Sequence, residues 1–162
     1  MFINDNVLKA ITNNRHCYVS PSYDVYLAAG FFNDRQNEAL QQVIDVCDEL
    51  GLKTYEPRRD SVQIGKNPTE EERQLNFDMN LDAILKSKFI IASTEGKDMG
   101  TIFEVGFAYA NHIPVFGFAP FIPKGMPFNL MLAQSMEEVF LSKEAMLGYF
   151  HGLSKPARVE AC

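Results

Sequence analysis

The chain has 162 residues, of which 46% are hydrophobic and 22% are charged, a size and composition typical of one globular domain. Its 15 basic and 21 acidic residues give a net charge of -6, which argues against binding to a nucleic-acid polymer but not against a nucleoside or nucleotide pocket. No apolar run is long enough to span a membrane.

The cysteines and histidines are few and widely spaced. They form no CxxC pair and no metal-ligand spacing. We therefore expect a reduced, cytoplasmic protein without a structural metal. The residues concerned are Cys17, Cys47, Cys162, His16, His112 and His151.

We interpret residues 1–22 as an N-terminal extension with a short helix at Asn6–Thr12, and residues 23–162 as one domain. The elements predicted for this domain follow one another as strands and helices. In chain order they are a strand at 24–32, a helix at 33–50, a short strand at 53–57, a polar loop at 58–66, a helix at 67–87, a strand at 88–93, a helix from about Thr101, a strand at 113–118, a loop or short helix at 125–135, a fifth strand at 137–142 and a helix at 143–150.

Two of these helices carry clear sequence signals. In the first, an apolar face repeats at helical spacing and Gly51 follows the last turn. In the second, Thr69 and Glu72 form a capping-box pattern at the start. The apolar face of the first is Leu40, Val43, Ile44 and Cys47, and that of the second is Leu75, Met79, Leu81, Ile84 and Leu85.

Alternation of strands and helices predicts an α/β fold with a mainly parallel five-stranded sheet flanked by helices. Ligands of such sheets bind at the carboxyl ends of the strands. Polar, glycine-containing turns follow three strands, so we expect Tyr26, Asp98 and Glu104 to lie at one edge of the sheet.

Each candidate also has an ordinary structural interpretation. Thr101 and Glu104 match a capping box, and Asp98 matches a turn residue before a helix. However, Glu104 has apolar neighbours, among them Phe103 and Val105, and a carboxylate in such surroundings is either well partnered or functional.

The remaining candidates also have both a structural and a functional interpretation. Tyr26 suits a strand core, and Asn129 suits a loop. Phe31 and Phe32 form an apolar pair after a glycine, which favours a pocket wall. A solvated loop and a phosphate site are both compatible with Arg58, Arg59 and Lys66, and the chain contains neither GxGxxG nor a Walker A loop.

Three segments together resemble the nucleoside 2-deoxyribosyltransferase family over about residues 24–140. They are "YLAAGFFNDRQNEA" (26–39), "DMGTIFEVGFAYA" (98–110) and "FNLMLAQS" (128–135). The first two are also similar to relatives that hydrolyse deoxynucleoside 5'-monophosphates. The third is more particular to the transferases.

This resemblance implies a flavodoxin-like fold and transfer of a 2-deoxyribosyl group between nucleobases without a cofactor. It places the nucleophile at Glu104, an active-site acid at Asp98 and the tyrosine that holds the nucleophile at Tyr26. It implies substrate contacts at Gly30, Phe31, Asn80, Gly100 and Asn129. The family's use of the asparagine from a neighbouring subunit implies a homo-oligomer with shared active sites, built from dimers and often hexameric.

One position departs from the family pattern. Where the family often has an aspartate in N-D-L-x-x-I, this chain has Asn80 in "MNLDAI", flanked by Asp78 and Asp82. An amide hydrogen-bonds a base but does not supply a proton as an acid. Two rival functions share the fold: a deoxynucleoside 5'-monophosphate N-glycosidase, which would also use Glu104 and Asp98, and a nucleotide-binding module without catalysis.

Overall fold

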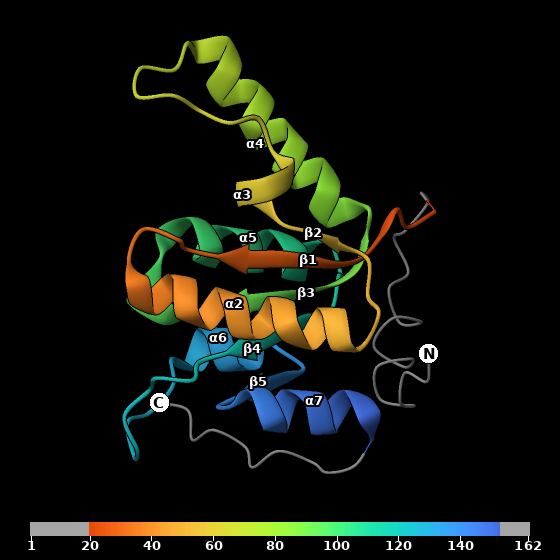
Figure 1. Cartoon of the computed structure of the whole chain (residues 1–162), viewed down its shortest axis with the longest axis vertical. Coiled ribbons are helices and arrows are strands. Elements are labelled where there is room, and N and C mark those ends of the chain that lie inside the picture. Colours follow the sequence, from red (N-terminus) through yellow and green to blue (C-terminus); the bar gives the residue numbers. More distant parts are fainter. Residues whose placement is uncertain (1–19, 153–162) are drawn as a thin grey trace.

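Five strands form one sheet in the order β2-β1-β3-β4-β5, and every neighbouring pair is parallel (Figure 1). The computed structural model describes residues 20–152, so the expected helix at Asn6–Thr12 lies outside the described residues. The strands are β1 (Tyr23–Ala29), β2 (Thr54–Tyr55), β3 (Ser87–Ser93), β4 (Val115–Phe118) and β5 (Glu138–Phe140).

Helices connect successive strands and cover both faces of the sheet (Figure 1). They are α2 (Asp34–Glu49), α3 (Pro57–Asp60), α4 (Glu70–Leu85), α5 (Met99–Ala110), α6 (Leu130–Gln134) and α7 (Lys143–His151), with a 3-10 turn η1 (Glu95–Lys97) before α5. The strand order is that of flavodoxin-like folds, which confirms the predicted fold class. The prediction missed α3, which lies inside the expected polar loop.

Alternating side chains of β1 divide the core between the two faces of the sheet. Val25 and Leu27 point to the layer of α2 and α7, where aromatic rings fill the space between β3, β4, β5 and α7. Tyr26 and Ala28 point to the layer of α4, α5 and α6. Both faces of β1 are therefore buried, which explains its continuous apolar sequence.

Helix α4 differs from its prediction. The capping box of Thr69 and Glu72 is confirmed by both of its hydrogen bonds. The predicted apolar face is only partly buried, because Leu75 is 51% and Leu85 is 41% exposed. Figure 1 gives the reason for Leu75: the N-terminal half of α4 extends beyond the β2 edge of the sheet, where no other element covers it. No helix among residues 20–152 is long and apolar enough to cross a membrane.

The aromatic cluster gives a stability prediction. Phe116 is fully buried and its ring contacts Phe89, Phe140 and Phe150 at centroid distances of 5.3 to 6.3 Å. Phe116→Ala should lower the free energy of unfolding by about 3–5 kcal/mol, because it leaves a cavity in a packed core. Urea unfolding measures this loss. Phe32→Ala is the control: its ring is 74% exposed, so the loss should stay within about 0.5 kcal/mol. Equal losses would contradict this assignment of the core.

Candidate functional site

The candidate site lies where the strand order reverses, between β1 and β3. In flavodoxin-like sheets this switch point is where ligands bind, outside the carboxyl ends of the strands. Here the loop after β1 (30–33) and the turn before α5 (94–98) meet at that end. Helix α5 then runs back over β1 and β3 and brings its side chains onto Tyr26.

Tyr26 and Glu104 form the centre of the site. The Tyr26 hydroxyl donates a hydrogen bond of 2.5 Å to Glu104 Oε1. Tyr26 is fully buried, and its aromatic ring stacks on Tyr55 of β2 at 5.6 Å between centroids. The hydroxyl is therefore fixed by the sheet and aimed at one carboxylate oxygen of the helix.

Burial governs the charge of this pair. Desolvation of the carboxyl is the largest cause that raises the pKa of Glu104, to about 7 from an ordinary 4.5. The Tyr26 hydrogen bond opposes the rise, and the negative charge of Asp98 adds to it. Burial also raises the pKa of Tyr26, so its hydroxyl remains a donor. A half-buried carboxylate of this kind is poorly solvated and is suited to act as a nucleophile or base near neutral pH.

The capping-box interpretation of Glu104 is wrong. Helix α5 begins at Met99, and its N-cap is Asp98, whose Oδ2 accepts from Thr101 N at 2.8 Å and from Thr101 Oγ1 at 2.9 Å. Glu104 therefore lies in the second turn, too far along to bond back to the cap. The turn interpretation of Asp98 is confirmed, since it caps the helix, and both bonds leave its Oδ1 without a partner among the described residues.

The predicted glycines allow close approach at Asp98. A Cβ at Gly30 would lie 2.5 Å from Gln36 Nε2 and 3.0 Å from Asp98 Cβ, and one at Gly100 would lie 3.2 Å from Asp98 Oδ2. A larger residue at Gly30 would have to displace the buried Gln36 amide. The absence of a side chain at both glycines thus leaves room for Asp98. Substrate contact through either glycine stays a prediction.

Two side chains of α2 join the loops at this edge. The buried Gln36 accepts from Phe32 N at 2.9 Å and donates to Glu95 O at 3.2 Å. Arg35 lies 3.4 Å from the carboxylate of Glu95 and donates to Phe121 O at 2.6 Å. The loops after β1, β3 and β4 are held together by these contacts.

Asn80 is linked to the central pair through one intervening side chain, that of Tyr55. Its Oδ1 accepts a hydrogen bond from Ser61 Oγ and a longer one, 3.4 Å, from the Tyr55 hydroxyl. Tyr55 in turn stacks on Tyr26. The structure therefore brings Asn80 to the same region as Glu104, on the β2 side of it.

Phe31 and Asn129 have no described hydrogen bond or ring contact with the central pair. Phe31 is 36% exposed and stacks on the more exposed Phe32 at 4.9 Å, so the pair forms a partly open wall beside the loop after β1. Asn129 is the exposed N-cap of α6 and accepts from Leu132 N at 3.2 Å. None of the described hydrogen bonds connects Asn129 with Tyr26 or Glu104 of the same chain.

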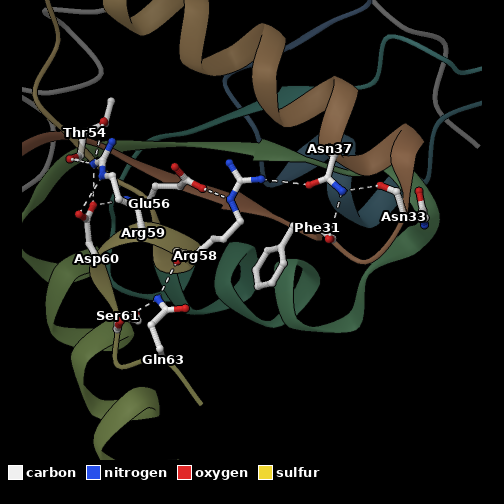
Figure 2. Close-up of polar contacts among 10 residues, drawn as sticks. All are labelled: Phe31, Asn33, Asn37, Thr54, Glu56, Arg58, Arg59, Asp60, Ser61 and Gln63. Carbon is white, nitrogen blue, oxygen red and sulfur yellow. Dashed lines mark hydrogen bonds and ion pairs between the residues drawn. The ribbon is translucent and has the colours of Figure 1, made fainter. Parts of the chain in front are cut away.

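The arginines of the expected polar loop are paired. Arg58 contacts Glu56 and Asn37, and Arg59 contacts Asp60, as Figure 2 shows. A phosphate site would need guanidinium groups whose charge is not already neutralised by carboxylates. Among residues 20–152, no three His, Cys, Asp or Glu side chains gather in a way that would hold a metal ion.

Gln36 and Tyr55 were not predicted as site residues from the sequence. Gln36 occupies the first turn of a surface helix, where a polar residue is unremarkable, and its burial depends on the turn before α5. Tyr55 lies on a strand of two residues whose pairing with β1 the sequence does not reveal. The one sequence signal for a role of Gln36 in the site was its position in the "DRQ" of the first segment that resembles the family.

Comparisons with known proteins give the family of the chain and similar folds. The family model described as nucleoside 2-deoxyribosyltransferase matches residues 25–131. A solved 2-deoxyribosyltransferase from Bacillus psychrosaccharolyticus is 29% identical, with a TM-score of 0.68 over 82% of this chain and 98% of that one. A conserved protein from Enterococcus faecalis V583 is 18% identical, with a TM-score of 0.64 over 79% of this chain and 96% of that one, and shares the fold. The comparison with curated proteins gave no match. The chain belongs to the nucleoside 2-deoxyribosyltransferase family.

Proposed function

We propose that this protein transfers a 2-deoxyribosyl group from one nucleobase to another through a covalent ester on Glu104. The observation that carries the proposal is the Tyr26–Glu104 hydrogen bond at the switch point of the sheet. It holds one carboxylate oxygen and leaves Oε2 without a hydrogen bond among the described residues. Family membership and the similar 2-deoxyribosyltransferase from B. psychrosaccharolyticus support this reaction.

In the first step Glu104 attacks the sugar. A carboxylate oxygen bonds to C1' of the deoxynucleoside through an oxocarbenium-like transition state, as in retaining glycosidases. The C1'–N bond breaks, and its electron pair remains on the departing base nitrogen. Asp98, whose Oδ1 is not used in capping α5, holds the base, takes up a proton from solvent on Oδ1 and passes it to that nitrogen.

In the second step the acceptor base reverses these events. Its ring nitrogen attacks C1' from the face that the first base left and gives up its proton to the relay at Asp98. The ester C–O bond breaks and returns its electron pair to the Glu104 carboxylate. Two displacements give overall retention at C1' and ping-pong kinetics. Phe31 contributes to the wall beside the base and limits access of water, the competing acceptor.

The hydrolase of 5'-monophosphates is the second candidate, because it would use the same two acids. It needs an anion pocket for the phosphate. The ion pairs of Arg58 with Glu56 and of Arg59 with Asp60 neutralise both guanidinium groups of the segment after β2 and favour an uncharged 5'-hydroxyl. A binding module without catalysis gives no reason for a carboxylate with a raised pKa at the switch point.

We further propose that the protein is a homo-oligomer built from dimers. Large apolar side chains are exposed on the layer of α4, α5 and α6, which we call the α4–α6 face. Such a surface is typical of a protein interface. The residues are Leu75, Phe77, Phe103, Tyr109, Leu130 and Met131, each at least 46% exposed. A second copy on this face would bring its Asn129 toward the first copy's site, where the amide would bind the sugar 5'-hydroxyl.

The central test uses Glu104→Gln, which keeps the shape of the side chain and its contact with Tyr26 but removes the nucleophile. Wild-type protein should form deoxyadenosine from deoxyinosine or thymidine only when adenine is added. The variant should be slower by at least about 10³-fold. Chromatography follows the products, and mass spectrometry should detect one deoxyribosyl group on the wild-type peptide that contains Glu104.

Other outcomes separate the candidates. Release of free base without exchange would indicate hydrolysis, and reaction of the 5'-monophosphates alone would favour the nucleotide hydrolase. Unchanged exchange in Glu104→Gln would contradict the proposed nucleophile.

The pH dependence should follow ionisation of Glu104. The ionised carboxylate is the active form, so kcat/KM should rise as the pH increases through about 7. Tyr26→Phe removes the hydrogen bond that lowers the pKa of Glu104, so the rise should move to higher pH. Asp98→Asn removes a negative neighbour but keeps a capping oxygen, so the rise should move to lower pH.

The measurement is kcat/KM over a range of pH, supported by the ¹³C chemical shift of the Glu104 carboxyl. The two variants act as controls for each other, because their shifts have opposite signs. Shifts of the same sign, or a rise centred at the ordinary glutamate pKa, would refute this account of the site.

If each active site takes Asn129 from a second subunit, two inactive variants should restore activity to each other when they are mixed. Glu104→Gln and Asn129→Ala subunits should each be nearly inactive alone. After mixing by reversible unfolding, a mixed dimer contains one site with an intact Glu104 and an intact partner Asn129, so about a quarter of the activity should return. No recovery in a mixture shown by mass to contain mixed oligomers would place Asn129 in its own chain's site.

Light scattering gives an independent check. Phe103→Glu on the α4–α6 face should reduce the oligomer to monomers, whereas Leu141→Glu, an exposed apolar residue before α7, should not.

A further inference from the structure

Glu56 is a buried carboxylate at the carboxyl end of β2, and it forms an ion pair with Arg58. Glu56 is 4% exposed, and its Oε1 lies 2.7 Å from Arg58 Nε (Figure 2). That contact is an ion pair without hydrogen-bond alignment, since Oε1 accepts no hydrogen bond. A buried carboxylate is costly without a partner, so the Arg58 guanidinium is held close to it.

The same guanidinium reaches across to the loop after β1. Arg58 Nη1 donates to Asn37 Oδ1 at 3.0 Å. Asn37 in turn donates from Nδ2 to Phe31 O at 3.3 Å and to Asn33 O at 3.0 Å. In Figure 2 the ring of Phe31 points from this loop toward the segment that carries Arg58 and Gln63.

On its other side Arg58 belongs to a segment that approaches the central pair. Gln63 Nε2 donates to Arg58 O at 2.8 Å and to Ser61 O at 3.3 Å. Ser61 bonds to Tyr55, which stacks on Tyr26. Residues 58–63, which we call the α3 segment, are therefore linked to the loop of Phe31 through Asn37 and to Tyr26 of the central pair through Tyr55.

We propose that Arg58 is a positioning residue that fixes the distance between the loop of Phe31 and the α3 segment, and so shapes the space for the nucleobase. This inference rests on the proposed function for the identity of the ligand. Arg58 acts on binding of the base and not on the bond-making step, because its contacts reach neither Glu104 nor Asp98. Its charge is neutralised by Glu56, so it is not itself an anion site.

Arginine is needed here because two partners lie in different directions. The planar guanidinium places its Nε beside the Glu56 carboxylate, as an ion pair, and donates a hydrogen bond from Nη1 on another edge to Asn37. The single ammonium of a lysine keeps the charge but does not hold both partners in the same geometry. Arg59 offers a matched control: it is the next residue of the same helix, and the described hydrogen bonds and ion pair of its side chain go only to Asp60 and Thr54.

The experiment compares Arg58→Lys with Arg59→Lys. In an otherwise wild-type chain, Arg58→Lys should raise KM for the deoxynucleoside by about tenfold with kcat nearly unchanged, as expected for loss of binding made equally in ground and transition states. In a Glu104→Gln background, which prevents turnover, calorimetry with thymidine and deoxyinosine should show the same weakening of Kd. Arg59→Lys should change neither value.

A second readout does not depend on substrate. Exchange of the backbone amide hydrogens of residues 31–33 and 61–63 should become faster in Arg58→Lys. It should stay unchanged at both loops in Arg59→Lys. The double variant Glu56→Gln/Arg58→Met removes both charges and so avoids an unpaired buried carboxylate. It should reproduce the KM effect with a melting temperature close to that of wild type.

Unchanged exchange and Kd in Arg58→Lys would overturn the inference while leaving transfer by the wild type intact. Equal effects of the two lysine variants would also overturn it, because they would indicate a general effect of the segment's charge. An effect on kcat alone, with KM unchanged, would assign Arg58 to the chemical step and refute a role in base binding. A wild type that binds and transfers nothing would refute the proposed function, whereas the exchange result would still decide whether Arg58 joins the two loops.

Discussion

The hydrogen bond from Tyr26 to Glu104 is the interaction on which the site depends. It joins a central strand to a helix, and it does so at a place where both elements are otherwise apolar. A carboxylate in such surroundings is costly unless a donor compensates for the lost water. The tyrosine supplies that donor, and the sheet fixes its direction. The same burial keeps the carboxylate basic, so the stability of the fold and the reactivity of the group have one physical origin.

The loops around this pair are held by side chains of a single helix. Gln36, Arg35 and Asn37 all lie in the first turn of α2. Gln36 and Arg35 both contact Glu95 after β3, Arg35 also contacts Phe121 after β4, and Asn37 contacts Arg58 after β2. The N-terminus of α2 thus acts as the common support for the loops after β1, β2, β3 and β4. A site assembled in this way depends on accurate placement of one helix end, which its N-cap Asn33 and its buried apolar face secure.

The sequence predicted the fold class and most elements, because the apolar runs of the strands and the helical spacing around Leu40 and Val43 are strong signals. The prediction that Tyr26, Asp98 and Glu104 meet at one edge followed from parallel topology, and the structure brings Tyr26 to Glu104.

The start of α5 was predicted at Thr101 and not at Met99, because Asp98 and Thr101 are both good N-caps and the sequence pattern does not choose between them. The pairings of Arg58 and Gln36 join segments distant in the sequence, so no local pattern reveals them. Leu75 looked like a core residue because periodicity reports an apolar face without reporting what covers it.

The raised pKa of Glu104 also links folding to protons. Between its ordinary pKa of 4.5 and about 7, the folded chain holds a proton on this carboxyl that the unfolded chain has released. Folding therefore takes up a proton in this range, and the contribution of Glu104 to stability is complete below pH 4.5 and is lost as the pH rises through 7. The proposed catalysis has the opposite dependence, since it needs the ionised group. Under that proposal, a molecule that is active at neutral pH has lost the stability that the protonated Glu104 carboxyl contributes.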